Sequence, residues 1–269
     1  MKTTFTLHPQ AGNADGAFAE APAAASLLST LHAEPADADA LMRAAVQALL
    51  QWQLQACTPT PTPQHPPLDA AWVRAGLQQF VADCVASEFG RDWAGDAQRQ
   101  RWWTLSSDAL TAGIDAQPRL PLHGDFTPAR LSLAEAGTPP VPYAVGPASH
   151  DLASLLRDPR QPWDEEQQLD WTIRYWEQAR KAGLPFDADF GTFWQQLEWT
   201  GLLRHLMQAA ALCRLKREGR VPEKTVQELL PRLLAHAVKV STRYVQLAPL
   251  ARLLEDLQGN LVQTGFTLR

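Results

Sequence analysis

The chain has 269 residues, of which 45% are hydrophobic and 20% are charged, a composition that supports a folded core and argues against wholesale disorder. The net charge of −5, with acidic and basic residues interspersed, argues against a protein that binds the phosphate backbone of nucleic acids. No apolar run approaches the ~20 residues that a membrane-spanning helix needs, so we expect no membrane association.

The beginning of the chain predicts little regular structure. Residues 1–25 are rich in Ala, Gly and Pro, and we expect this part to be frayed or partly disordered. The opening MKTTFTLHPQAG holds a single lysine and no apolar stretch, so it is not expected to be a secretory signal. Three widely spaced cysteines without a Cys-x-x-Cys motif suit a reducing compartment, and we therefore expect a cytoplasmic protein.

Sustained helical periodicity begins with Ala36–Gln55, where apolar residues recur at helical spacing behind an acidic first turn. The proline-rich run of residues 58–67 then predicts a polyproline-like connector, either a plain spacer or a ligand for an aromatic groove. Helical spacing resumes over Leu68–Phe89, and a further helix is predicted over Asp96–Ala112.

Between Leu120 and Val145 the pattern changes to short apolar pieces with prolines and glycines. LPLHGDF and ARLSLAE predict short extended elements around a loop. From Asp151 onward helices dominate again, since glycines and prolines separate long amphipathic stretches. These stretches predict helices over Asp164–Lys181, Phe190–Leu215, Glu223–Leu247 and Pro249–Gln258.

The sequence His123-Gly124-Asp125-Phe126 lies in this non-helical island, after a run that predicts a strand. An aspartate on a rigid loop is a candidate base or orienting group for a substrate hydroxyl, as phosphoryl-transfer enzymes need. A histidine in such a place more often serves to pin the loop. By itself the His-Gly-Asp sequence is a weak signal, and its surroundings decide how it is interpreted.

Those surroundings resemble a known group of kinases. LPLHGDFTPARLSL resembles the catalytic loop of the aminoglycoside phosphotransferase and choline kinase superfamily, whose pattern is H-x-D-x-x-x-x-N. GPASHDLASLLRD, residues 146–158, resembles the segment after that superfamily's second metal-binding aspartate. ADALMRAAVQALLQWQ, WDEEQQLDWTIRYWEQARKAGLP and EWTGLLRHL are similar to the anomeric N-acetylmuramate/N-acetylglucosamine kinases of bacterial cell-wall recycling. The resemblance covers Leu27 to Gln258 and is strongest from Leu120 onward.

The resemblance implies a mainly α fold, namely the helical C-terminal lobe of a protein-kinase-like enzyme with a small β element around the loop. This lobe would comprise residues 36–269, with the proline-rich connector inside it. Kinases of this group place a β lobe before the first helix of that lobe. Residues 1–35 are too few for several strands of ordinary length, so we expect a truncated β lobe of which they are the remnant.

The resemblance also implies roles for particular residues. Asp125 matches the catalytic base, His123 the histidine that shapes the loop, and Asp151 the aspartate that braces the loop through hydrogen bonds. In the related kinases the helical lobe supplies the sugar cleft. By analogy the candidates for contact with a sugar are Glu198, Trp199, Arg204 and His205; the alternative for the polar residues is a cluster that packs helices together.

Two expected metal ligands are replaced in this chain. Arg130 stands where the superfamily has a magnesium-binding asparagine, and a guanidinium offers no lone pair and repels a divalent cation. The run Thr138–Val145, which should hold the metal-binding aspartate, contains no carboxylate. We therefore expect no metal site. An isolated base contributes about 3–5 kcal/mol, less than the ~8 kcal/mol or more that catalysis requires.

These departures lead to three hypotheses about function. The first is a pseudokinase that binds an amino sugar or a protein partner and needs no cofactor. The second is an active kinase that phosphorylates N-acetylmuramate or N-acetylglucosamine at the anomeric hydroxyl with Asp125 as base, in which case ATP and Mg²⁺ are required. The third is a scaffold that associates with itself or with a protein through the face that a missing β lobe would leave.

Overall fold

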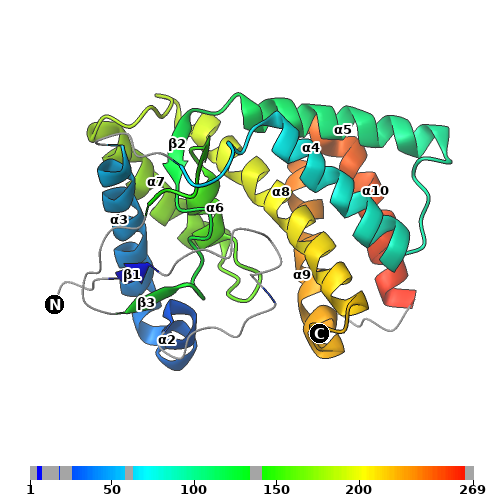
Figure 1. Cartoon of the computed structure of the whole chain (residues 1–269), viewed down its shortest axis with the longest axis horizontal. Coiled ribbons are helices and arrows are strands. Elements are labelled where there is room, and N and C mark those ends of the chain that lie inside the picture. Colours follow the sequence, from blue (N-terminus) through cyan, green and yellow to red (C-terminus); the bar gives the residue numbers. More distant parts are fainter. Residues whose placement is uncertain (1–4, 8–17, 19–25, 58–62, 134–140, 264–269) are drawn as a thin grey trace. The chain divides into compact units, whose positions relative to one another are not determined.

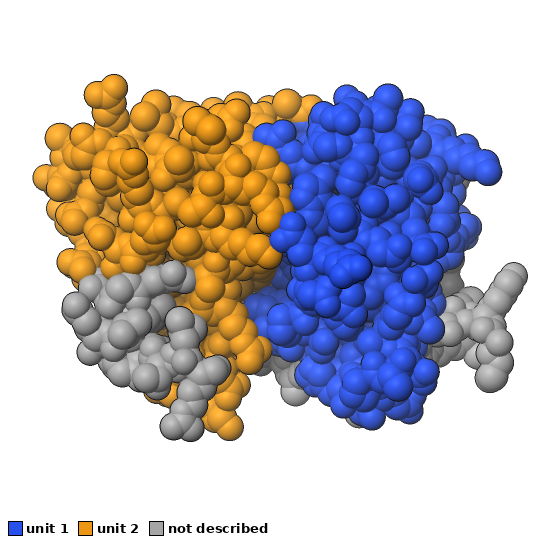
Figure 2. All heavy atoms as spheres, turned by 180° about the vertical axis from the view of Figure 1, so that it is seen from behind, with its two compact units in different colours: residues 1–12, 21–68, 117–197 blue, residues 13–20, 69–116, 198–269 orange. Residues whose placement is uncertain are grey.

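The computed structural model describes residues 5–7, 18, 26–57, 63–133 and 141–263, which Figure 1 draws as a cartoon with most of their helices and strands labelled. Within these residues the chain is mainly helical, as the sequence predicts. It divides into two compact units, coloured separately in Figure 2: unit 1 comprises residues 1–12, 21–68 and 117–197, and unit 2 comprises residues 13–20, 69–116 and 198–269. None of the described helices combines the length and the apolar character needed to cross a bilayer.

The strands of unit 1 form two small antiparallel pairs. β1 (Phe5–Leu7) pairs with β3 (Leu131–Leu133), with Phe5 opposite Leu133. β2 (Arg119–Leu122) pairs with β4 (Ala144–Pro147), with Arg119 opposite Pro147. The short extended elements predicted on both sides of the His123 loop are therefore confirmed. Most of residues 1–25, for which the sequence predicts disorder, lies outside the described residues.

Residues 63–68, at the end of the predicted proline-rich connector, lie beside β4 and are called the strip below. The amides of His65 and Leu68 donate to the carbonyls of Tyr143 and Val145 at 2.8 and 2.9 Å. Both sequences advance in the same direction, so the strip extends the β2–β4 pair as a parallel neighbour. Residues 58–62 of the connector lie outside the described residues. The strip itself contains Pro63, Pro66 and Pro67.

The helices of unit 1 pack around these strands, and α3 contacts α6, α7 and β2. The helix predicted over Ala36–Gln55 is confirmed, and Asp164 caps the helix predicted to begin there by accepting a hydrogen bond from the amide of Gln167 at 2.8 Å. A short helix after Ser26 was not predicted. The helices are α2 (Leu27–Ala33), α3 (Ala38–Ala56), α6 (His150–Leu156), α7 (Glu165–Lys181) and the start of α8 (Phe190–Arg217), with the 3-10 turn η1 (Pro35–Asp37).

Aromatic side chains fill the centre of unit 1. Phe193 stacks on Tyr175 at 6.0 Å between ring centroids and meets the edge of Phe186 at 4.8 Å. Burial of each such ring stabilises the fold by roughly 1.5–3 kcal/mol. All seven residues of the neighbouring helix α6 are buried. Unit 1 thus encloses a short, immobilised helix directly behind the loop that follows β2.

All regular elements in the described part of unit 2 are helices. α10 packs on α9 and α5, and α4 packs on α5. The core between them consists mainly of buried leucine side chains, including Leu230, Leu233 and Leu254. The elements of unit 2 are α4 (Ala70–Gln79), η2 (Phe80–Glu88), α5 (Ala97–Asp115), α8 from Glu198 onward, α9 (Glu223–Arg243), η3 (Val245–Leu247) and α10 (Ala248–Gln263).

Two predicted helices of unit 2 are interrupted. The helix predicted over Leu68–Phe89 changes after Gln79 into a π-helix, η2, which turns Cys84 and Val85 into the core. The helix predicted to run to Leu247 ends at Arg243, because Tyr244 adopts an extended backbone with φ −116° and ψ 125°. Neither change is visible in hydrophobic periodicity, since apolar residues continue through both places.

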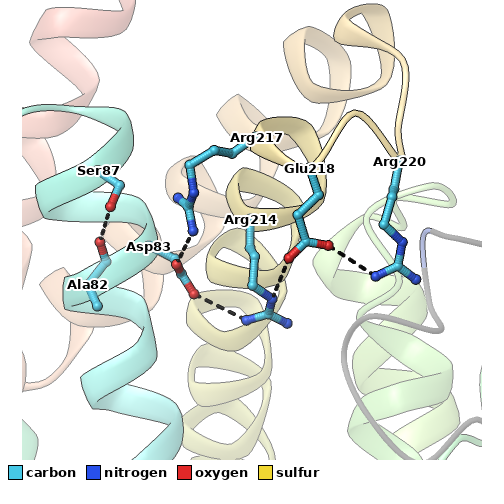
Figure 3. Close-up of polar contacts among 7 residues, drawn as sticks. All are labelled: Ala82, Asp83, Ser87, Arg214, Arg217, Glu218 and Arg220. Atoms are coloured by element: carbon cyan, nitrogen blue, oxygen red, sulfur yellow. Dashed lines mark hydrogen bonds and ion pairs between the residues drawn. The ribbon is translucent and has the colours of Figure 1, made fainter.

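An ion network ties the π-helix to the end of α8, as Figure 3 shows. Asp83 of η2 accepts hydrogen bonds from Arg214 at 3.1 Å and from Arg217 at 2.6 Å. Glu218 in turn pairs with Arg214 at 3.9 Å and with Arg220 at 3.1 Å. Because the side chain of Asp83 is only 15% exposed and serves two cations, it is shielded from water far more than a single surface pair.

Replacement of this carboxylate should weaken the fold. We expect Asp83→Asn to lower the free energy of unfolding by about 1–3 kcal/mol, because Arg214 and Arg217 lose their common negative charge while staying close to each other. Urea unfolding followed by circular dichroism measures the loss. Glu228→Gln is the control, since its pair with Lys224 is well exposed, and we expect a change within about 0.5 kcal/mol. Equal losses in the two variants would contradict this account.

Candidate functional site

The loop after β2 is held by one carboxylate. Asp151, fully buried in the first turn of α6, accepts a hydrogen bond from the amide of His123 at 2.7 Å and another from the amide of Gly124 at 2.9 Å. A carboxylate also matches the positive end of the α6 dipole. The geometry gives Asp151 the loop-bracing contacts that the sequence predicts for it.

His123 is buried under the loop. Its Nδ1 accepts a hydrogen bond from the amide of Asp125 at 3.3 Å, and its ring meets Trp52 and Phe126 edge-on at 5.8 and 5.5 Å. Burial lowers the pKa of His123 from its usual value to about 4, so the imidazole is neutral at physiological pH. A neutral, immobile ring in contact with the loop backbone fits a structural role.

Position 124 requires a glycine, because any side chain there would be strained and would clash. Its φ of +85° lies in the region that side chains avoid, and an added Cβ would lie 2.8 Å from Cδ1 of Tyr143. Tyr143 in turn stacks on His65 at 4.1 Å between ring centroids. The sequence analysis assigned neither residue a role: Tyr143 lies in the run Thr138–Val145, which was considered only for carboxylates, and His65 lies in the proline-rich connector.

Asp125, at the predicted base position, is paired with the residue that replaces the expected asparagine. The Nε atom of Arg130 lies 3.3 Å from Oδ2 of Asp125, and the two side chains are 20% and 12% exposed. Arg130 is itself fixed by a turn in which its amide donates to the carbonyl of Thr127 at 2.9 Å. The carboxylate can therefore be reached from solvent, but in this state a guanidinium shares its charge.

A second arginine lies nearby. Arg160 donates to Asp158 through Nε at 2.9 Å and through a terminal nitrogen at 2.6 Å, and the amide of Arg160 donates to the same carboxylate. Burial by itself would lower the pKa of Arg160, but the charge and hydrogen bonds of Asp158, with a further contribution from Asp125, raise it overall. The Arg-Asp-Pro-Arg run of residues 157–160, whose first two residues end the quoted motif, was the available signal for this pair, and the sequence analysis assigned it no role.

The described residues do not fit a divalent cation. They contain no group of three or more His, Cys, Asp or Glu side chains that could hold a metal ion. At the position of the expected asparagine ligand, Arg130 places positive charge against Asp125. Magnesium prefers oxygen ligands and loses its own water reluctantly, so a site with a guanidinium in this place does not suit it.

The residues predicted to contact a sugar lie in unit 2, whereas Asp125 lies in unit 1. Glu198 is buried and accepts hydrogen bonds from Arg243 and from the hydroxyl of Tyr244, each at 2.5 Å. Trp199 meets the ring of Tyr244 edge-on. These contacts join α8 to the end of α9, as the alternative of a helix-packing cluster describes.

The other two candidates lie one to two turns further along α8. Nδ1 of His205 lies 2.8 Å from Nδ1 of His236 on α9, and Arg204 is half-buried. A contact between two ring nitrogens requires a proton on one of them and a lone pair on the other. The assignment of all four residues to a sugar cleft stays a prediction.

Comparison with known proteins supports the resemblance seen in the motifs. No family model matches the chain. A protein of Neisseria meningitidis named N-acetylmuramate/N-acetylglucosamine kinase is 42% identical over 208 residues, which cover 75% of this chain and 60% of that protein. Proteins with the same name from Pseudomonas putida and Pseudomonas aeruginosa are 30% and 28% identical, and the matches cover 83% and 86% of this chain.

The chain spans less than two thirds of the length of these curated relatives, with 64% of the P. putida protein and 66% of the P. aeruginosa protein matched. Their names favour the hypothesis of an active kinase and give no support to the expected loss of catalysis. Over most of its length, the chain is similar to proteins named as kinases of N-acetylmuramate and N-acetylglucosamine.

Proposed function

We propose that the chain is a sugar kinase of the aminoglycoside phosphotransferase type. In this proposal the terminal phosphoryl group of ATP is transferred to the anomeric hydroxyl of N-acetylmuramate or N-acetylglucosamine. The observation that carries the proposal is the similarity at 42% identity to a kinase named for these sugars, together with an aspartate on a braced, glycine-containing loop at the expected place.

Asp125 would act as the general base. As the new bond between the sugar oxygen and phosphorus forms and the bond to the leaving ADP breaks, the proton of the hydroxyl passes to the Asp125 carboxylate. Such a transfer requires the hydroxyl within about 2.6–3.2 Å of the carboxylate. His123 and Asp151 would contribute indirectly, because they fix the backbone that carries the base.

The ion pair between Arg130 and Asp125 favours a second candidate, the pseudokinase of the sequence analysis. A carboxylate held by a guanidinium is a weaker base, because the nearby positive charge favours its ionised form. A protein in that state could still bind an amino sugar. We rank this candidate second because the similar proteins are named as kinases.

Removal of the base should separate the two candidates. We expect the wild-type chain to form sugar 1-phosphate from ATP and N-acetylglucosamine, and Asp125→Asn to slow this about 10²–10⁴-fold, the usual contribution of a positioned base. The product is measured by phosphorus NMR. Asp170→Asn is the control, since Asp170 pairs with Arg43 and Arg174 on an exposed part of unit 1, and its rate should equal that of wild type. A wild-type chain that forms no product would overturn the kinase proposal.

The buried histidine should make stability depend on pH. The pKa of His123 is about 4 in the folded chain and ~6.5 when unfolded, so above pH 6.5 the ring is neutral in both states and has no effect. As the pH falls below 6.5 the unfolded state takes up the proton first, which lowers the free energy of unfolding by about 2 kcal/mol at pH 5. Urea unfolding at pH 7.5 and pH 5 should show a smaller difference for His123→Gln than for wild type. Identical differences would mean that the histidine is not buried in its neutral form.

A further inference from the structure

Asp125 and two neighbouring aspartates, Asp151 and Asp158, are each engaged by donors of the chain itself. Asp151 accepts two main-chain amides, Asp158 accepts the amide and the guanidinium of Arg160, and Asp125 faces Arg130. Asp151 and Asp158 are almost completely buried, so their contacts belong to the framework. Asp125, with 12% of its side chain exposed, is the least buried of the three.

We propose that this site binds a phosphate group directly through Arg130, and that no metal ion occupies the position. The inference rests on the proposed function for the class of ligand, a compound with a terminal phosphate. It goes beyond that function by stating which residue holds the phosphate. An arginine takes this place because the residues present do not suit a divalent cation.

Arginine suits this task for geometric reasons. The planar guanidinium matches the spacing of two phosphate oxygens and stays charged at every relevant pH. Arg130 is presented from a hydrogen-bonded turn directly before β3, so its backbone is already ordered before a ligand arrives. The 20% exposure of its side chain leaves it shielded enough for a strong interaction and open enough for contact with solvent.

Binding of phosphate would also change the state of the base. An incoming dianion competes with the Asp125 carboxylate for the Arg130 guanidinium, and the exchange replaces one anion by another at the same cation. Asp125 then no longer faces the guanidinium at 3.3 Å, so its carboxylate oxygens are available to accept the proton of the sugar hydroxyl when the phosphate donor is in place. In this way the ion pair would couple occupancy by phosphate to activation of the base.

The test is calorimetric titration of the full chain with ATP and with N-acetylglucosamine 1-phosphate, each in EDTA and in Mg²⁺. We expect at least one ligand to bind in EDTA, and Arg130→Gln to bind it at least tenfold more weakly. Arg174→Gln is the matched control, since Arg174 pairs with Asp170 on the surface of α7, and it should bind as wild type does. Binding of ATP alone would identify the transferred phosphate, and binding of the sugar phosphate alone would identify the product.

Arg130→Lys keeps the positive charge without the planar fork, and we expect an affinity between those of wild type and Arg130→Gln. Equal thermal melting of the variants shows that the fold is kept. The inference is overturned if neither ligand binds in EDTA, or if Arg130→Gln binds as tightly as wild type. It is also overturned if Arg130→Asn, which supplies an oxygen ligand, binds ATP more tightly than wild type in Mg²⁺.

Turnover measured on the same preparations separates this inference from the proposed function. A chain that forms no sugar phosphate, yet binds phosphate in EDTA through Arg130, removes the kinase function and keeps the phosphate site. A chain that forms product only in Mg²⁺, with Arg130→Asn faster than wild type, keeps the kinase function and removes the direct phosphate site.

Discussion

The carboxylate of Asp151 accepts hydrogen bonds from two successive main-chain amides, and the geometry of the candidate site depends on it. The carboxylate sits in the first turn of α6, whose residues are all buried, so it cannot move without disturbing the core of unit 1. Because the amides of His123 and Gly124 both donate to this buried carboxylate, the direction in which the chain leaves β2 is fixed. The side chain of Asp125 therefore starts from a backbone set by the interior of the unit.

The three aspartates of this region differ in the donors that surround them. Two main-chain amides donate to Asp151, the guanidinium and amide of Arg160 donate to Asp158, and Asp125, the least buried of the three, faces the guanidinium of Arg130. A charge buried in the first two ways costs several kcal/mol if its partner is removed, so those residues are confined to structure. Asp125 has the most exposed carboxylate of the three, and in the proposed function it is the one that takes part in the chemistry.

The helices and their starts were largely predictable because their signals are local. Asp164 caps the helix that follows it, and helical periodicity located α3 and α5 within a few residues. The π-helix after Gln79 and the extended Tyr244 were not predictable, since both depend on contacts with residues far away in the sequence. The same holds for Glu198, whose partners Arg243 and Tyr244 lie 45 and 46 residues further along.

The candidate site was predictable in its residue types but not in its contacts. The motif located Asp125, His123 and Asp151, and the replacement by Arg130 could be read from one position. The sequence could not reveal that Arg130 pairs with Asp125, because neighbours in a loop can point in any direction. Tyr143 escaped notice for a related reason: it lies against Gly124, which carries no side chain to suggest a partner, and His65 stacks on Tyr143 from a distant part of the chain.

The strip of chain beside β4 has a consequence for how the molecule behaves in a crowded solution. A sheet edge with a full row of amide hydrogens is a template on which another chain can add a strand. The strip covers that edge of β4 with a sequence in which Pro63, Pro66 and Pro67 have no amide hydrogen to offer. An approaching strand finds no amide hydrogen at these three positions, so this side of the small sheet is protected from intermolecular strand pairing and aggregation.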